Sequence, residues 1–405
     1  MTKILSGVRV IEVAAWMFVP AAGAVLADLG ADVIKIEHPE KGDPQRAWIA
    51  PGQDRAKLNK NLMMELGNRG KRSVAIDLSR EEGRELLYQL VETADVFLTN
   101  SLPSVRQKLG IDVEQIQARN PRILYMRGSG FGPKGPDAAS PAYDGNTYWA
   151  RAATAHALKP AGDVWPLAGT QAFGDLWGSL TIAASILGGL YHRERTGESP
   201  VMDVSLLSVG MWGMSPGITA TAMYGMDDMP RLRREDSPNP ISGYFQSSDG
   251  RFVSLSMLQS DRYFRPLCAA LDVPELAEDP RFLDSKARAQ NRQACRAALD
   301  EVFARYTLAE LADRLSSQPG PWGTVQTQPE LHDDAQALAN GYFSDVSDPE
   351  GNHWRVVPTP IQYGEQAVGE LRPCPAHGEH TDEVLGELGL DWDTILAHKV
   401  SGVIL

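Results

Sequence analysis

The sequence predicts an α/β protein with a parallel sheet in a large domain and a second, smaller α+β domain. The chain has 405 residues, and a length of this order usually divides into two domains. Hydrophobic residues make up 43% and charged residues 22%, which is ordinary for a globular protein. The early part of the chain alternates strand-like and helix-like segments, and this pattern changes after about residue 230.

The N-terminal half justifies the parallel sheet. A β-rich run at Val8–Val13 leads through Pro20 into an Ala-rich helical stretch at Ala21–Leu29, and a second strand follows at Ala31–Ile36. A βαβ unit favours parallel strands with a right-handed crossover. Further predicted elements are strands at Ser73–Leu78, Asp95–Thr99 and Ile123–Arg127 and a helix at Arg80–Thr93. The segment therefore predicts a Rossmann-like domain.

The remaining elements define the domain limits. Residues 130–172 form a long Gly- and Pro-rich loop, which is usually functional in a compact domain. The elements predicted after it are a helix at Asp175–Arg195, a strand at Val201–Val204, a hairpin at Gly243–Gln246 and Phe252–Ser256, helices near Asp261–Leu271, Asn291–Tyr306 and Thr307–Ser316, an extended segment at 352–364 and a helix at Glu379–Leu388. We predict a large domain at 1–230, a small domain at 231–327 and a return to the large domain at 328–405.

Composition excludes several classes of partner. The net charge of −13 argues against nucleic acid. The cysteines, Cys268, Cys295 and Cys374, form no CxxC pair, which suits a reducing cytoplasm. No run approaches the roughly 20 apolar residues of a membrane span, and the N-terminus does not resemble a signal peptide. His377 and His380 lack a third ligand nearby, so we expect no metal. The sequence predicts a cytoplasmic protein without membrane partners.

The sharpest local feature is Phe173-Gly174-Asp175, where the long loop becomes a helix. Gly174 permits a tight entry. Asp175 has two interpretations: it is a helix cap, or it is a carboxylate nucleophile that forms an acyl anhydride. Spacing alone favours the cap and leaves the second interpretation open.

Six motifs, in a fixed order along the chain, favour the interpretation of Asp175 as a nucleophile. They are LSGVRVIEV to KIEHPEKGD at 5–43, NRGKRSVAIDL at 68–78, ADVFLTN at 94–100, RILYMRGSGFGPKGP at 122–136, GDLWGSL to VMDVSLL at 174–207 and GEHTDEVLGELGL at 378–390. Together they resemble the class III CoA-transferase (CaiB–BaiF) family. The resemblance implies that Asp175 accepts the acyl group as a mixed anhydride and then carries CoA as an aspartyl thioester, with coenzyme A as co-substrate. It also implies an interlocked homodimer.

The resemblance also assigns CoA contacts by position. They are His38, Ile76, Asn100, Lys108, Tyr143 and Asp144. His38, Ser79 and Leu102 stand where basic residues are common in the family. We therefore expect fewer basic contacts to the CoA phosphates than is usual in the family, and Arg80 or Arg106 could replace them.

Trp16 and Met17 occupy the expected substrate position. Formyl- and oxalyl-specific members resemble one another in a Gln there and in a Gly-rich loop that Ser256–Gln259 lacks. We therefore expect a bulky apolar acyl group. Two alternatives remain open. An α-methylacyl-CoA racemase would use a His base where this chain has Tyr143, and a tyrosine with a pKa of about 10 is a poor base. A non-catalytic CoA-binding paralogue would bind CoA without exchange.

Overall fold

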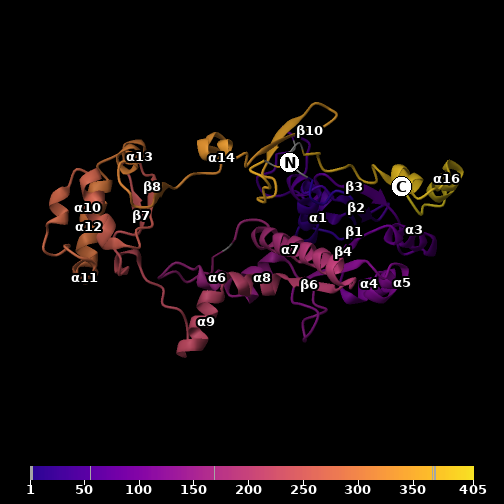
Figure 1. Ribbon diagram of the computed structural model, residues 1–405, viewed down its shortest axis with the longest axis horizontal. Helices are drawn as coiled ribbons and strands as arrows, with labels where there is room; N and C mark the ends of the chain where they lie inside the picture. The colour runs from indigo at the N-terminus through magenta and orange to yellow at the C-terminus, as the bar shows by residue number, and fades with distance from the viewer. Residues whose placement is uncertain (1–2, 55, 168, 367, 369–370) are drawn as a thin grey trace. The chain divides into compact units, whose positions relative to one another are not determined.

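The chain forms two compact units. The computed structural model describes residues 3–54, 56–167, 169–366, 368 and 371–405. One unit comprises Met1–Leu158, Pro166–Asp227 and Ala335–Leu405, and the other comprises Lys159–Trp165 and Asp228–Asp334 (Figure 1). The domain limits predicted from the sequence, 1–230, 231–327 and 328–405, stay predictions.

The first unit is built on a parallel six-stranded sheet, which confirms the predicted mixed α/β class. The strands follow the order β3-β2-β1-β4-β5-β6. Their bounds are β1 Arg9–Val13, β2 Asp32–Glu37, β3 Arg72–Ala75, β4 Val96–Thr99, β5 Leu124–Ser129 and β6 Val201–Ser205. The chain order reverses between β1 and β4, which pair directly. Loops leaving the carboxyl ends of two such strands diverge and open a crevice, the usual ligand position in this sheet type.

Helices cover both faces of this sheet. Alternate β1 residues face opposite ways, so Val10 joins one core and Ile11 the other. The Val10 face packs against α1 (Phe18–Asp28) and α7 (Phe173–Thr196). The Ile11 face packs against α3 (Glu81–Glu92), α5 (Val113–Arg119), α15 (Thr381–Glu387) and α16 (Trp392–Val400). Both faces of the sheet are therefore buried under helices, as expected for parallel strands.

Helix α7 passes closely over α1. A Cβ at Gly178 would collide with the ring of Phe18, so glycine permits this approach. By length and composition, α7 is the one helix among the described residues that could cross a membrane. Its Ile182 and Ile186 are instead buried in the sheet core, as in the central helix of a globular domain.

The C-terminal segment closes the first unit beside β3. The Ala75 N–H donates to Thr381 Oγ1 at 3.0 Å, and the Asp77 N–H donates to the Val403 carbonyl at 2.8 Å. In Figure 1 the yellow C-terminal helices accordingly lie next to the indigo strands. Before them the segment contains α14 (Ala335–Ala339) and a hairpin of β10 (Ser344–Ser347) and β11 (His353–Val356).

Several short helices lie in stretches to which the sequence assigned no element. They are α2 (Leu62–Asn68), α4 (Pro103–Leu109), α6 (Thr154–Ala157), α8 (Leu206–Gly213) and α9 (Ser215–Tyr224), with one wide helical turn at Gly145–Arg151. Two predicted helices also begin early. Helix α1 starts at Phe18, with Pro20 in a first turn that needs no N–H from it. Helix α7 starts at Phe173.

The second unit is a smaller α+β body. Its antiparallel sheet contains β7 (Gly243–Gln246), β8 (Phe252–Leu255) and β9 (Trp322–Thr324). Its helices are α10 (Ser260–Ala270), α11 (Ser285–Gln290), α12 (Arg292–Phe303) and α13 (Leu308–Ser316). The rings of Phe245 and Phe303 stack at 4.4 Å in its core.

Candidate functional site

The crevice at the carboxyl ends of β1 and β4 is organised by one amide. Asn100 follows β4, and its Nδ2 donates to the Ala15 carbonyl at 2.6 Å. Its Oδ1 accepts the Ala15 N–H at 3.1 Å. Asn100 was predicted to contact CoA, and it does line the crevice. Its amide, however, is engaged in holding the loop that follows β1.

The same loop places Trp16 in an unusual conformation. Its φ is 67°, in the left-handed region that costs non-glycine residues free energy. The Trp16 N–H donates to Asp43 Oδ1 at 3.2 Å, which helps to fix this conformation. The Trp16 indole then meets the Tyr143 ring edge-on, with centroids 5.6 Å apart. Two predicted site residues are thereby brought together.

A cluster of buried charges supports the loop that follows β1. Lys35 Nζ lies 2.9 Å from Asp43 Oδ2 and 3.3 Å from Glu12 Oε1, and it donates to the Ala14 carbonyl at 2.8 Å. Lys71 Nζ lies 2.8 and 2.7 Å from the two Glu12 oxygens. Burial alone would lower the pKa of Lys35, but the neighbouring Asp43 and Glu12 carboxylates outweigh burial and raise it. We call Glu12, Lys35, Asp43 and Lys71 the balanced cluster.

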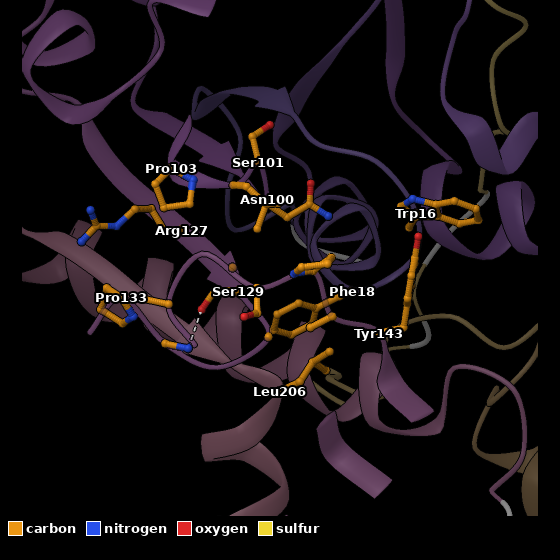
Figure 2. Close-up of a pocket in the computed structure, with 18 of the residues that line it drawn as sticks. Trp16, Phe18, Asn100, Ser101, Pro103, Arg127, Ser129, Pro133, Tyr143 and Leu206 are labelled. Atoms are coloured by element: carbon orange, nitrogen blue, oxygen red, sulfur yellow. Dashed lines mark hydrogen bonds between the residues drawn. The ribbon is translucent and has the colours of Figure 1, made fainter. Parts of the chain in front are cut away.

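The crevice contains a cavity of about 510 Å³. It is lined by the loop after β1, the start of α4, the Gly-rich loop after β5 and the start of α7. Figure 2 shows Trp16 and Tyr143 at one end, Arg127 and Pro133 at the other, and Phe18 and Leu206 between them. A smaller cavity of about 150 Å³ shares Ala15, Asn100 and Ser101 with it and is also lined by His38.

Asp175 lies in the wall of the larger cavity. It is the third residue of α7, whose N-cap is Ala172, so the cap interpretation is wrong. The preceding Gly174 N–H donates to Asp144 Oδ2 at 3.2 Å. A Cβ at Gly174 would collide with the Asp144 carboxylate and the Tyr148 ring. Glycine at this position therefore lets Asp144 approach the first turn of α7.

Asp144 and Asp175 lie in this corner, and none of the described residues places a cation beside them. Burial, and then the charge of Asp144, raise the pKa of Asp175 to about 7. Burial also raises the pKa of Asp144, against the opposing effect of its hydrogen bond from Gly174. Asp144 Oδ1 is buried, and the Trp149 indole is a further group that opposes the rise in the pKa of Asp144. At neutral pH Asp175 is therefore poised between its acid and its carboxylate.

The other predicted contacts are scattered. Ile76 is 1% exposed and packs in the Ile11 core, and Lys108 is exposed on α4. Neither lines the two cavities described, so their roles in CoA binding stay predictions. His38 accepts the Glu40 N–H on Nδ1 at 3.1 Å, which leaves Nε2 to carry the ring proton. Met17 is buried yet borders the larger cavity.

Arg127 is a cavity residue that the sequence reasoning did not single out. It lies near the carboxyl end of β5, inside the motif RILYMRGSGFGPKGP. A charged residue at the end of an otherwise buried parallel strand is the sequence signal that could have identified it.

Comparison with known proteins places this site in a family. The model of CoA-transferase family III matches residues 5–381. This chain belongs to CoA-transferase family III. It is 32% identical to (R)-2-hydroxy-4-methylpentanoate CoA-transferase of Clostridioides difficile over 99% of both chains. It is 33% identical to succinate–glutarate CoA-transferase of Agrobacterium fabrum over 95% of both.

The fold agrees with this family assignment. A CaiB/BaiF family protein from Brucella suis superposes with a TM-score of 0.79 at 31% identity, covering 95% of this chain and 99% of the other. This family III protein is thus an enzyme, a class III CoA-transferase, and a CoA thioester is its co-substrate.

Proposed function

We propose that the enzyme moves CoA between an acyl-CoA and a carboxylic acid through covalent intermediates on Asp175. The observation that carries this proposal is a cavity-lining carboxylate with a pKa of about 7, beside which no cation lies in the described part of the chain. Such a group is substantially ionised at neutral pH. Its raised basicity makes it a better nucleophile than an ordinary aspartate.

The reaction proceeds by exchange of acyl bonds. An Asp175 oxygen attacks the thioester carbonyl and expels CoA thiolate, which leaves a mixed anhydride. The thiolate attacks the Asp175 carbonyl carbon of that anhydride, so the donor acid leaves and an aspartyl thioester remains. The acceptor carboxylate then attacks the aspartyl thioester and releases the thiolate again. Finally the thiolate attacks the acceptor acyl carbon, which forms the new acyl-CoA and restores Asp175. No step consumes ATP.

The start of α1 supports the developing oxyanion. Met17 and Phe18 border the cavity, and no side chain caps this helix end. The first N–H groups of a helix have no partner within it, and they carry the positive end of its dipole. Donors already fixed in a site stabilise a forming oxyanion without reorganisation. The neighbouring Phe18 and Leu206 side chains limit access of water to the anhydride.

A bulky apolar acyl group is the substrate class we propose. Trp16, Phe18, Tyr143 and Leu206 provide apolar and aromatic walls close to Asp175 in the same cavity. The relative from C. difficile is named for a branched acid, and the one from A. fabrum for two dicarboxylic acids. A panel of branched, aromatic and short dicarboxylic acceptors tests the class. Exclusive use of formate or oxalate would contradict it.

The deciding experiment compares wild type with Asp175→Ala and a control, Asp137→Ala, in the loop after β5. Acyl-CoA is added, hydroxylamine traps the activated carboxylate, and mass spectrometry locates the adduct. We expect the adduct at residue 175 in wild type and the control. We expect none in Asp175→Ala, with transfer reduced at least about 1,000-fold. Full transfer by Asp175→Ala would overturn the mechanism. Deuterium entering the α-position without transfer would indicate a racemase instead.

We also propose a cytoplasmic, interlocked homodimer. Large apolar side chains lie exposed on α7, α8 and α9, namely Trp177, Tyr191, Trp212, Met223 and Tyr224. Large exposed apolar patches usually mark an interface, and these side chains could contribute to one. Free Cys268, Cys295 and Cys374 suit a reducing compartment. Light scattering tests the dimer, and a monomer at micromolar concentration would contradict it.

A further inference from the structure

The end of the cavity remote from Trp16 contains an ion pair that the reaction above does not use. The β5–β6 register places Arg127 beside Asp203. Arg127 Nε and Nη2 each donate to one Asp203 oxygen at 2.8 Å. The remaining nitrogen, Nη1, has no partner among the described residues. The Arg127 side chain is 21% exposed, and it lines the cavity.

A second arginine in the same cavity is held in the same way. Arg106 on α4 donates from Nε to Asp112 Oδ1 at 3.1 Å and from Nη1 to the Ser101 carbonyl at 2.8 Å. Its Nη2 has no partner in the described part of the chain. Both arginines line the cavity that contains Asp175. Each therefore has a fixed guanidinium with one donor group left over.

Fixed guanidinium donors are suited to oxyanions. The planar fork matches phosphate and carboxylate geometry, and a preoriented side chain loses little entropy on binding. Asp203 and Asp112 offset the positive charge while the site is empty, which makes this arrangement tolerable without a ligand. The smaller cavity offers only His38 as a basic lining residue. Of the two cavities, the larger one therefore contains the arginine side chains that a polyanion needs.

We propose that Arg127 and Arg106 form an oxyanion subsite, which binds either a phosphate of CoA or the distal carboxylate of a dicarboxylic acid. This inference rests on the proposed transferase function and specifies how its substrate is held. The subsite explains how the enzyme binds an anionic co-substrate although His38, Ser79 and Leu102 supply no fixed positive charge.

The alternative to an oxyanion subsite is that the Arg127–Asp203 ion pair only joins strands β5 and β6. A matched control variant distinguishes these two roles. Arg119 also forms a two-contact pair, with Glu85 at 3.2 and 2.6 Å, and it does not line the cavity. Arg119→Gln therefore removes a comparable surface pair at a distance from the proposed subsite.

The test measures the Kd of CoA by calorimetry for wild type, Arg127→Gln, Arg127→Lys and Arg119→Gln. If the bound anion is a phosphate of CoA, loss of one charge-assisted hydrogen bond predicts a Kd about 10-fold higher for Arg127→Gln. Arg127→Lys keeps the positive charge but lacks the planar guanidinium group, so its Kd should lie between those of wild type and Arg127→Gln. Arg119→Gln should bind as wild type does.

Steady-state kinetics identify the anion. If it is a phosphate, the KM for every acyl-CoA rises and kcat changes little. If it is a carboxylate, the Kd of CoA is unchanged and only the KM for succinate rises, while that for 4-methylpentanoate does not. Unchanged Kd and KM in both arms, or an equal loss in Arg119→Gln, overturns the subsite. The Kd of CoA needs no turnover, so it can be measured even if the wild type transfers nothing. In that case the missing transfer refutes the proposed function, and an unchanged Kd in Arg127→Gln separately overturns the subsite.

Discussion

Two groups of buried or partly buried charges lie near the carboxyl end of the same sheet, and they are built in opposite ways. In the balanced cluster, Glu12 contacts Lys35 and Lys71, and Asp43 contacts Lys35. At the start of α7, Asp144 and Asp175 have no cation beside them among the described residues. The first group fixes backbone, because its members hold the Ala14 carbonyl and the Trp16 N–H. The second holds a carboxylate in an unfavourable environment.

The difference shows how burial serves structure in one place and chemistry in the other. Buried ions of opposite sign compensate one another's lost hydration only when their geometry is good. Where compensation is missing, a carboxyl group responds by taking up a proton, and its pKa rises. The environment of Asp175 therefore lowers the stability of the fold at neutral pH and raises the basicity of the carboxylate. The predictions below remove the compensation from the first region or relieve the imbalance in the second.

Glu12→Gln should have the largest effect on stability. The change leaves Lys71 without the carboxylate that it contacts, and breaking a buried ion pair costs about 3–5 kcal/mol. Burial already lowers the pKa of Lys71 to about 8, so the variant should lose a proton there. Urea unfolding at pH 7 measures the loss. Glu85→Gln is the control, because it removes the partly exposed ion pair with Arg119. A loss of stability equal to that of the control would show that the cluster is not structural.

Asp175→Asn should act in the opposite direction. The folded pKa of about 7 lies above the 3.8 of an ordinary aspartate, so between these two pH values the folded state binds a proton that the unfolded state does not. Stability is then complete below about pH 4 and falls as the pH rises towards 7. The variant lacks this loss, so at pH 8 it should exceed wild type by up to about 4 kcal/mol. Equal stability of the two proteins at pH 8 would contradict the raised pKa.

The rate should follow the same titration. Only the carboxylate of Asp175 can attack, so kcat/KM should fall about tenfold per pH unit below 7 and level off above it. A stopped assay with one acyl-CoA between pH 5 and 9 gives the profile. A midpoint near pH 4 would show that Asp175 has the pKa of an ordinary, hydrated aspartate and would contradict the raised value.

The sequence predicted the sheet because β-branched runs mark each strand, but it could not predict contacts that depend on packing between distant segments. Asp144 meets Gly174 across a long loop, and Arg127 meets Asp203 only because β5 and β6 pair. Motif order pointed to Asp175, whereas its environment follows from burial that no local pattern records. Short α4 likewise decides that Arg106 faces the cavity and Lys108 faces solvent.

The smallest effect should come from Asp144→Asn, which tests the two carboxylates as a pair. Burial is the larger cause of the raised pKa of Asp175, and Asp144 is the smaller. Removing the charge should therefore lower the midpoint of the rate profile without returning it to the value of an ordinary aspartate. At pH 6 we expect kcat/KM about threefold above wild type, which corresponds to roughly half a pKa unit. The amide oxygen can still accept the Gly174 N–H, so thermal stability should change little. A midpoint that does not move would leave burial as the sole cause, and a midpoint near 4 would make Asp144 the dominant one.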